Sequence, residues 1–302
     1  MEKRTLGKTG LSVTTLGHGA MEVRGARIWN GRPVTDAQAE RILNAVLDCG
    51  INFIDTSYDY GMSEEYIGRF LSRRRGEFYL ATKCGCTLVN KGDHDDTPHV
   101  WTRENLLHNI ETSLKRMKTD HVDLWQLHNP TVEETRAGDL VAVLQEVKKS
   151  GKVRHIGISS TLPHISQYIA MGVFESFQIP YSALERRHEE VIGKAHQSGA
   201  GVIVRGGVAR GEPEKGLGAA ERWTLFSKAR LDDLLAPGED RTGFLLRFTL
   251  THPGAHTVIV GTLNPDHLER NAKAVQAGRL SPETYAEARK RLADAGEKPE
   301  AV

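Results

Sequence analysis

Apolar runs alternate along the chain with amphipathic segments, and this alternation indicates the order of its elements. Short runs rich in Val, Ile, Leu and Phe, bounded by glycine or polar residues, predict strands. Stretches with apolar residues three and four positions apart predict helices, and several of these end at a glycine-containing stop such as Cys49-Gly50. The predicted strands are residues 16–19, 53–55, 79–83, 122–127, 153–158, 174–179, 202–205 and 257–260. The predicted helices are residues 36–48, 64–72, 103–117, 140–149, 163–171, 187–198, 241–251 and 266–277.

Two short segments precede this alternation. Residues 4–6 and 11–13 flank a glycine-rich turn, which predicts a β-hairpin. The eight strands and eight helices that follow show no internal repeat and no low-complexity linker. We therefore predict one α/β domain over residues 1–302, a (βα)8 TIM barrel with an N-terminal β-hairpin. A doubly wound sheet is the alternative, but neither residues 17–19 nor residues 205–207 open a G-x-G-x-x-G dinucleotide signature.

Composition and charge narrow the class of partner. The 302 residues are 39% hydrophobic and 26% charged, which is ordinary for a soluble globular protein. A net charge of +1 argues against a nucleic-acid or membrane-surface partner, and no apolar run approaches the roughly 18 residues of a membrane span. The N-terminus lacks the apolar core of a signal peptide, and three cysteines imply no disulfide framework, so we expect a cytoplasmic protein. The sequence does not indicate an oligomeric state.

Three connections are long for this fold, namely residues 20–35, 84–101 and 206–237. Each follows a strand, so in a barrel all three rise from the face on which catalytic groups gather. They carry Trp29, Trp101, Trp223 and Phe226. Because aromatic side chains are typical of binding surfaces, we predict that these connections form binding walls or lids rather than plain surface loops.

Four ionisable side chains fall at strand ends on this face. Asp55 ends the second strand and Tyr60 follows it, Lys83 ends the third, and His128 ends the fourth. Adjacent parallel strands are about 5 Å apart, so these ends converge on one small volume. Each residue alone is more often a solvated lip residue or a structural histidine. Together, on three consecutive strands, they predict a proton-transfer site.

The chemistry of these four groups is mutually consistent. A phenol, with a pKa of about 10, needs its pKa lowered by about 3 to exchange a proton near neutral pH. A lysine ammonium at about 4 Å supplies roughly that effect, so we expect Lys83 to lower the pKa of Tyr60 while Asp55 keeps Lys83 charged. His128 can orient a substrate oxygen or relay a proton. This set suits protonation of a carbonyl oxygen while hydride reaches the carbon.

Five segments carry a resemblance to the aldo-keto reductase family, which extends over about residues 4–276. They are residues 53–64, Thr82-Lys83, and residues 123–128, 151–159 and 258–271. The resemblance implies a (βα)8 barrel that reduces an aldehyde or ketone to an alcohol, or the reverse, with NADPH or less often NADH. It also implies that Tyr60 is the general acid/base and that Asp55, Lys83 and His128 complete a catalytic tetrad.

The same resemblance implies a cofactor site. Ser159 and Gln178 would hydrogen-bond the nicotinamide carboxamide, and Tyr181 would stack on the ring. The adenosine end would lie near the start of the last predicted helix, where Asn264-Pro265-Asp266 favours free amides facing phosphate. Its contacts would be Gly261, Thr262, His267 and Asn271.

The chain departs from the family at several of these positions. Many relatives carry Ser-Asn where this chain has Ser159-Ser160. The usual Ser/Pro-Leu after the seventh strand is replaced by residues 205–210, where Arg205 would contact cofactor phosphate. Residues 263 and 264 offer no positive charge for a 2′-phosphate. We predict NADP(H) in preference to NAD(H), by a smaller margin than in relatives with a full basic clamp.

Two other classes of function stay open at this stage. The first is a nucleotide-cofactor-binding regulatory subunit with little turnover, against which the intact tetrad argues. The second is a metal-dependent barrel hydrolase using Cys84, Cys86, His94 and His99. Because Cys-x-Cys is not a standard zinc spacing, we predict no metal. The expected partner is a small carbonyl or alcohol substrate.

Overall fold

The computed structural model of the chain describes residues 1–213 and 216–302. Its centre is a closed barrel in which the strands follow the order β10-β11-β12-β3-β4-β5-β8-β9, each pair parallel. The predicted TIM barrel is therefore confirmed. The largest difference between a predicted and an observed strand boundary is at β10, which begins at residue 176 rather than 174. The barrel strands are β3 (Leu16–Gly19), β4 (Phe53–Asp55), β5 (Tyr79–Cys84), β8 (Val122–His128), β9 (Val153–Ser159), β10 (Ser176–Pro180), β11 (Gly201–Arg205) and β12 (Thr257–Val260).

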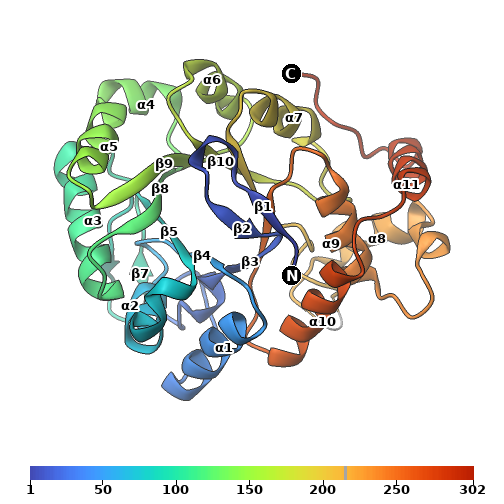
Figure 1. Cartoon of the computed structure of the whole chain (residues 1–302), viewed down its shortest axis with the longest axis horizontal. Helices are drawn as coiled ribbons and strands as arrows, with labels where there is room; N and C mark the ends of the chain where they lie inside the picture. The colour runs from blue at the N-terminus through green and yellow to red at the C-terminus, as the bar shows by residue number, and fades with distance from the viewer. Residues whose placement is uncertain (214–215) are drawn as a thin grey trace.

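Helices surround the barrel (Figure 1). At the first of them, Thr35 and Gln38 form a capping box, and at α10 Asn264 is the N-cap with Pro265 directly after it, as predicted. No helix within the described residues is long and apolar enough to cross a membrane. The predicted helices appear as α1 (Asp36–Asp48), α2 (Ser63–Phe70), α3 (Arg103–Met117), α5 (Leu140–Lys149), α6 (His164–Met171), α7 (Glu189–Gln197), α9 (Arg241–Thr251) and α10 (Pro265–Gln276).

Further elements lie where the sequence predicted none, and two of the long connections contain some of them. These elements are β6 (Val89–Asn90), β7 (Asp95–Asp96), α4 (Val132–Ala137), α8 (Ala220–Lys228) and α11 (Pro282–Asp294). Trp223 and Phe226 of α8 stack at 5.9 Å and are buried in the core, where Phe226 also meets Phe244 of α9. The prediction that Trp223 and Phe226 line a binding wall is wrong, because both side chains are buried and Phe226 packs against helix α9 outside the strands.

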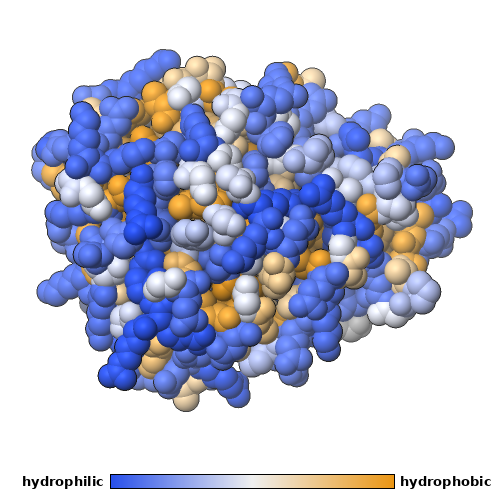
Figure 2. Space-filling view, in the orientation of Figure 1, coloured by the Kyte–Doolittle hydropathy of each residue, from blue (hydrophilic) through white to orange (hydrophobic). Residues whose placement is uncertain are grey.

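The N-terminal hairpin closes one end of the barrel (Figure 1). Its strands β1 (Lys3–Thr5) and β2 (Ser12–Thr14) are antiparallel, with Arg4 opposite Val13, and a 3-10 turn at Gly7–Thr9 follows β1, which confirms the predicted hairpin. Side chains of the hairpin and of the barrel strands share one apolar cluster, made of Leu6, Leu11, Val13, Phe53, Ala81, Leu124 and Ile203. The face around the hairpin is otherwise mostly polar (Figure 2).

Two residues beyond this apolar layer, the inward positions of the strands become polar. Phe53 is followed by Asp55 on β4, Ala81 by Lys83 on β5, and the corresponding position of β8 holds Gln126. Because the side chains of a strand alternate between its two faces, residues two positions apart point to the same side. The apolar and the polar residue of each strand therefore belong to adjacent layers of the barrel interior. The ionisable layer therefore lies at the carboxyl ends of the strands, opposite the hairpin.

Candidate active site

A buried ion pair lies at the centre of this polar layer. Lys83 Nζ is 2.6 Å from Asp55 Oδ2 and donates a second hydrogen bond of 2.7 Å to the Thr56 carbonyl. The two side chains are 1% and 2% exposed. Burial alone would lower the pKa of Lys83, but Asp55, Tyr60 and Asp59 together raise it above its usual value. Lys83 therefore keeps its positive charge at a depth where water is scarce.

Two glutamine side chains hold the other oxygen of Asp55. Its Oδ1 accepts from Gln126 Nε2 at 3.1 Å and from Gln178 Nε2 at 2.8 Å. Gln126 was not predicted as a site residue, although it is a polar residue at an inward position two residues before His128. These bonds fix the carboxylate and therefore the ammonium that it anchors.

Tyr60 lies directly against this pair. Lys83 Nζ is 4.8 Å from the centroid of its ring, and the His128 ring meets it edge to face at 6.0 Å. Burial raises the pKa of Tyr60, Lys83 opposes that rise, and Asp55 and Asp59 add to it, so the pKa lies above its usual value. The expectation of a lowered pKa is wrong, because burial and two carboxylates outweigh one ammonium. At neutral pH the phenol is a proton donor.

The orientation of His128 is set by a neighbouring carboxylate. Its Nδ1 is 3.4 Å from Asp59 Oδ1 and 3.4 Å from Ser57 Oγ, and Ser57 donates a short hydrogen bond to Asp59. Burial would raise the pKa of Asp59, but His128, Ser57 and Lys83 hold it well below its usual range. Asp59 is therefore ionised and lies beside Nδ1 of His128. The structure thus brings Asp55, Tyr60, Lys83 and His128 together.

Three of the predicted cofactor residues lie beside this cluster, at the ends of adjacent strands. Ser159 of β9 is buried and pairs in register with Gln178 of β10. Arg205 ends β11, and burial lowers the pKa of its guanidinium while nearby Tyr60 and Asp55 act against that change. Ser159, Gln178 and Arg205 therefore border the space next to Tyr60.

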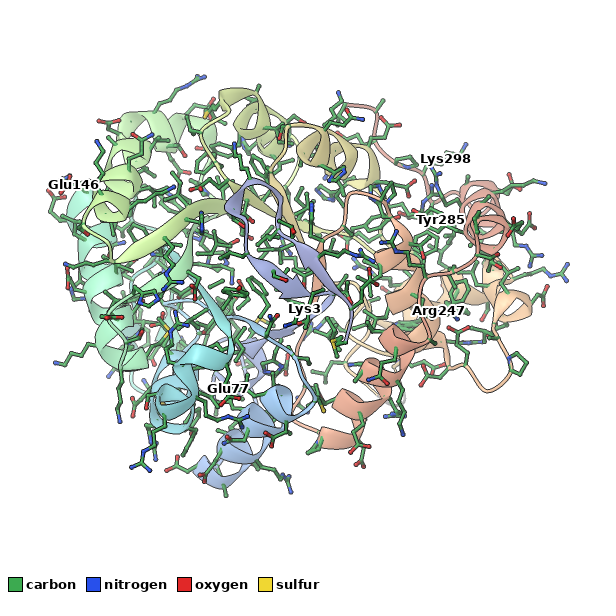
Figure 3. All side chains as sticks on the ribbon, viewed as in Figure 1. Lys3, Glu77, Glu146, Arg247, Tyr285 and Lys298 are labelled. Atoms are coloured by element: carbon green, nitrogen blue, oxygen red, sulfur yellow. The ribbon has the colours of Figure 1, made fainter. Side chains whose placement is uncertain are left out.

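Tyr181 does not reach this space. Its side chain is fully buried, its hydroxyl lies 3.1 Å from Glu189 Oε2 and 3.2 Å from the Tyr285 hydroxyl, and its ring packs on His252. Tyr285 projects from α11 toward α9 (Figure 3), where it meets Phe248 at 4.9 Å. The assignment of Tyr181 to the nicotinamide ring is corrected, because these contacts direct its side chain into the core outside the barrel.

The residues predicted for the adenosine end gather at the start of α10. Gly261 is exposed, and a side chain there would begin 2.6 Å from the Gly19 carbonyl, so only glycine fits. Thr262 Oγ1 accepts from the Asn264 amide at 3.0 Å, and Asn271 is buried except for 8% of its surface. The pKa of His267 is lowered by burial and by cations that include Arg270 and Arg32.

Arg32 was not expected near α10. It belongs to the first long connection and forms an ion pair of 3.0 Å with Glu22, while remaining 53% exposed. No local pattern could show that this connection reaches an element more than 200 residues away. Arg32 thus brings a positive charge toward His267, although Glu22 pairs with it.

Two of the three long connections flank the cluster and contact each other. The Trp29 ring meets Tyr60 edge to face at 5.7 Å, and its Nε1 donates to Thr97 Oγ1 at 3.2 Å. Arg27 of the same connection binds Asp95 of the second one at 2.6 Å. Residues 20–35 and 84–101 thus form joined walls beside Tyr60.

The four residues considered for a metal hydrolase do not form one site. Cys84 Sγ is buried 3.5 Å from the Gln126 carbonyl, and His94 is exposed and bonded to Asp93 at 2.7 Å. Cys86 and His99 lie instead beside His128. The metal-hydrolase hypothesis is therefore not supported, because its four proposed ligands do not lie together.

Comparison with known proteins identifies the class. The sequence profile of the Aldo/keto reductase family matches residues 15–224, which is more than half of the chain. The chain belongs to this family, whose members are oxidoreductases that use nicotinamide cofactors.

Three of the similar proteins come from bacteria. The solved aldo-keto reductase AKR11C1 from Bacillus halodurans, in its holo form, is 31% identical, covers 96% of each chain and superposes with a TM-score of 0.84. The uncharacterized oxidoreductase YqkF of Bacillus subtilis is 31% identical over 303 residues, 94% of each chain. The NADH-specific methylglyoxal reductase of Escherichia coli is 32% identical over 205 residues, covering 63% of this chain and 61% of its own.

Proposed function

We propose that the protein is an NAD(P)H-dependent reductase that converts an aldehyde or ketone to an alcohol, or catalyses the reverse reaction, with Tyr60 as the general acid/base. The observation that carries this proposal is the Tyr60 ring packed against the buried Asp55–Lys83 ion pair. When bound, the nicotinamide supplies or accepts the hydride at the carbonyl carbon. The proton would be donated or accepted by a side chain of the protein itself.

In the direction of reduction, Tyr60 donates its proton to the substrate oxygen. The phenolate left behind lies close to the Lys83 ammonium, which stabilises the new negative charge more strongly than it stabilises the neutral phenol. Asp55, fixed by Gln126 and Gln178, keeps that ammonium charged and in position. In the reverse direction the phenolate accepts the proton of the alcohol.

His128 and Trp29 would position the substrate. Because Nδ1 of His128 is directed at Ser57 and Asp59, Nε2 is the nitrogen that would meet the substrate oxygen. Trp29 is 47% exposed and packs against Tyr60, so one of its faces can limit where the rest of the substrate lies. These two side chains would hold the carbonyl within reach of the phenol, where orientation alone can lower the barrier by several kcal/mol.

The residues present fit a nicotinamide cofactor. Ser159 and Gln178 offer polar groups for a carboxamide beside Tyr60, although one amide hydrogen of Gln178 is already given to Asp55. The Arg205 guanidinium would contact the cofactor phosphates. Gly261 approaches Gly19 so closely that only backbone fits there, and the adenosine end of the cofactor would meet this backbone. Thr262, His267 and Asn271 would provide the neighbouring contacts.

We further propose NADP(H) as the preferred cofactor, with NAD(H) also accepted. The support is the positive charge of Arg32 and Arg270 near His267 at the start of α10. The E. coli relative is named as NADH-specific, so NAD(H) is the alternative that the binding measurement must distinguish.

A turnover assay tests the function. The purified protein is mixed with NADPH or NADH and a small reactive aldehyde, and the absorbance of the reduced cofactor is followed. We expect many turnovers per protein molecule. Cofactor binding without turnover, over a panel of aldehydes and ketones, would contradict the reductase and support the regulatory subunit.

A further inference from the structure

Cys86, His99 and His128 offer three metal-ligand atoms that all lie within 4.8 Å of one another. We propose that these residues bind a borderline-soft divalent cation, Zn²⁺ in the first place. One thiolate and two imidazoles form a donor set that zinc favours, with a fourth position left for water or another oxygen. The carbonyl reduction proposed above makes no use of Cys86 or His99, so this site goes beyond it.

The spacing of the two inner ligands matches such an ion. Cys86 Sγ lies 3.8 Å from His128 Nδ1. A tetrahedral zinc with bonds of about 2.3 Å to sulfur and about 2.0 Å to nitrogen places these two atoms roughly 3.5 Å apart. His99 is exposed, so a small movement of its ring can close the remaining gap without disturbing the core.

The backbone that carries Cys86 and His99 is held in place. The two residues face each other in an isolated antiparallel bridge, flanked by hydrogen bonds from Thr87 N to the Pro98 carbonyl and from Val100 N to the Gly85 carbonyl. The His99 ring also stacks on Trp101 at 5.3 Å. The backbone that carries these two ligands is therefore ordered before any ion arrives, which reduces the entropy cost of binding.

Helix α3 adds a second support through two asparagine side chains. Asn109 donates to the Cys86 carbonyl at 3.1 Å and accepts from the Gly85 amide at 2.8 Å, and Asn105 donates to the Val100 carbonyl at 2.8 Å. These amides orient the ligand-bearing segment in the way that outer-shell groups support metal sites.

Charge at the site also suits a cation. Asp59 Oδ1 lies 3.4 Å from His128 Nδ1 and brings a carboxylate to the same volume. Binding would displace the Cys86 thiol proton to solvent, so zinc uptake releases a proton. Because the ion would take Nδ1 of His128, an occupied site is expected to slow carbonyl reduction, and this last expectation alone rests on the proposed function.

Titration of the full-length protein with Co²⁺ tests the site by its spectrum. We expect a thiolate-to-cobalt charge-transfer band and the visible bands of a tetrahedral ion, both abolished by excess Zn²⁺. Cys86→Ser should lose the charge-transfer band, and His99→Phe, which keeps a ring on Trp101, should weaken Zn²⁺ binding by at least about 10-fold. Cys49→Ser, which removes a thiol at the end of α1, is the matched control and should behave as wild type.

The absence of a thiolate band in the wild-type protein would overturn the proposal. So would Cys86→Ser and His99→Phe variants that bind Zn²⁺ as tightly as wild type. A normal cobalt spectrum combined with unchanged turnover would support the metal site and contradict only the role proposed for His128 in the reaction.

Discussion

Lys83 Nζ lies 2.6 Å from Asp55 Oδ2 although both side chains are almost completely buried. An unpaired ammonium at this depth would tend to lose its proton, because burial disfavours the charged form. The carboxylate prevents that loss and so maintains a positive charge 4.8 Å from the centroid of the Tyr60 ring. The ion pair thus supplies the phenol with a permanent cationic neighbour.

Replacing Lys83 with Met should therefore change the pH dependence of reduction. The reaction needs the protonated phenol, so activity falls as pH rises through the pKa of Tyr60. Lys83 lowers that pKa, and its removal should move the alkaline limb to higher pH while kcat falls by about 100-fold or more. Because the pKa of wild-type Tyr60 already lies above its usual value of about 10, initial rates from about pH 6 to pH 11 should show the alkaline limb only near the top of that range, and the limb should leave the range in the variant.

Lys83→Arg is the control for this experiment, because it keeps a positive charge beside Asp55. Its alkaline limb should lie closer to that of the wild type. Removing one partner of a buried ion pair costs about 3–5 kcal/mol of stability, so chemical unfolding of Lys83→Met must first establish that the variant is folded at each pH. A folded Lys83→Met variant with an unchanged pH profile would remove Lys83 from its proposed role.

Trp29→Ala should raise KM for a bulky aldehyde about 10-fold and lower kcat much less. The reason is that Trp29 contacts Tyr60 through its ring and presents its remaining surface to the substrate side. Losing that apolar contact removes binding energy on the order of 1–2 kcal/mol. Thr97→Val, which removes only the acceptor of Trp29 Nε1, should leave KM within about threefold of wild type. Equal effects of the two variants would assign the result to loop order rather than to the ring.

Arg32→Ala should weaken NADPH more than NADH. One charge-assisted contact to a 2′-phosphate is worth about 1.5–3 kcal/mol, or roughly one to two powers of ten in affinity. Quenching of protein fluorescence by each reduced cofactor measures the two dissociation constants. Arg279→Ala is the control, since that arginine pairs with Glu2 and is not among the cations that act on His267. If Arg32→Ala weakened both cofactors equally, or if wild type bound NADH more tightly, the proposed preference would be contradicted.

Glu175 joins three elements of the fold, and its contribution to stability should depend on pH. Its carboxylate binds Lys148 Nζ of α5 at 2.6 Å and His155 Nδ1 of β9 at 2.7 Å, and it precedes β10. Burial would raise its pKa, but His155 and Lys148 lower it to about 2. A depressed folded pKa means that the stabilisation is fully present above the unfolded value of about 4.3 and is lost as pH falls through about 2.

Glu175→Gln should accordingly lower the free energy of unfolding by about 2 kcal/mol at pH 7, with the deficit shrinking to less than about half at pH 3. Urea unfolding at the two pH values measures it. Glu111→Gln breaks an exposed pair with Lys152 and should cost less than about 1 kcal/mol. A deficit for Glu175→Gln that did not change with pH would show that the pair is not its source.

The barrel and the tetrad could be predicted because both depend on local pattern. Strands of a parallel barrel are short apolar runs at regular intervals, and their last residues reach one face whatever the loops do. Asp55 and His128 end such a run and Lys83 is the next-to-last residue of its own, so their proximity follows from the strand order alone. The inward position of Gln126 follows from the same alternation.

Other features could not be predicted because they depend on contacts between distant segments. Tyr181 follows the last residue of β10, so strand alternation no longer fixes its direction, and Glu189 and Tyr285 draw it into the core. The pKa of Tyr60 depends on the depth of its burial and on Asp59. The sequence places Asp59 next to Tyr60 but does not show the direction of its side chain. The approach of Arg32 to α10 has no local signal at all.

The single-turnover rate of the Tyr60→Phe variant tests the central claim most directly. The variant keeps the ring that packs against Lys83, Trp29 and His128 and loses only the hydroxyl group that carries the proton. With saturating NADPH and a small aldehyde, the rate of cofactor oxidation should fall by about 100- to 10,000-fold, while the dissociation constant of NADPH stays within about twofold of wild type. Oxidation at a rate near that of the wild type would contradict the assignment of Tyr60 as the proton donor.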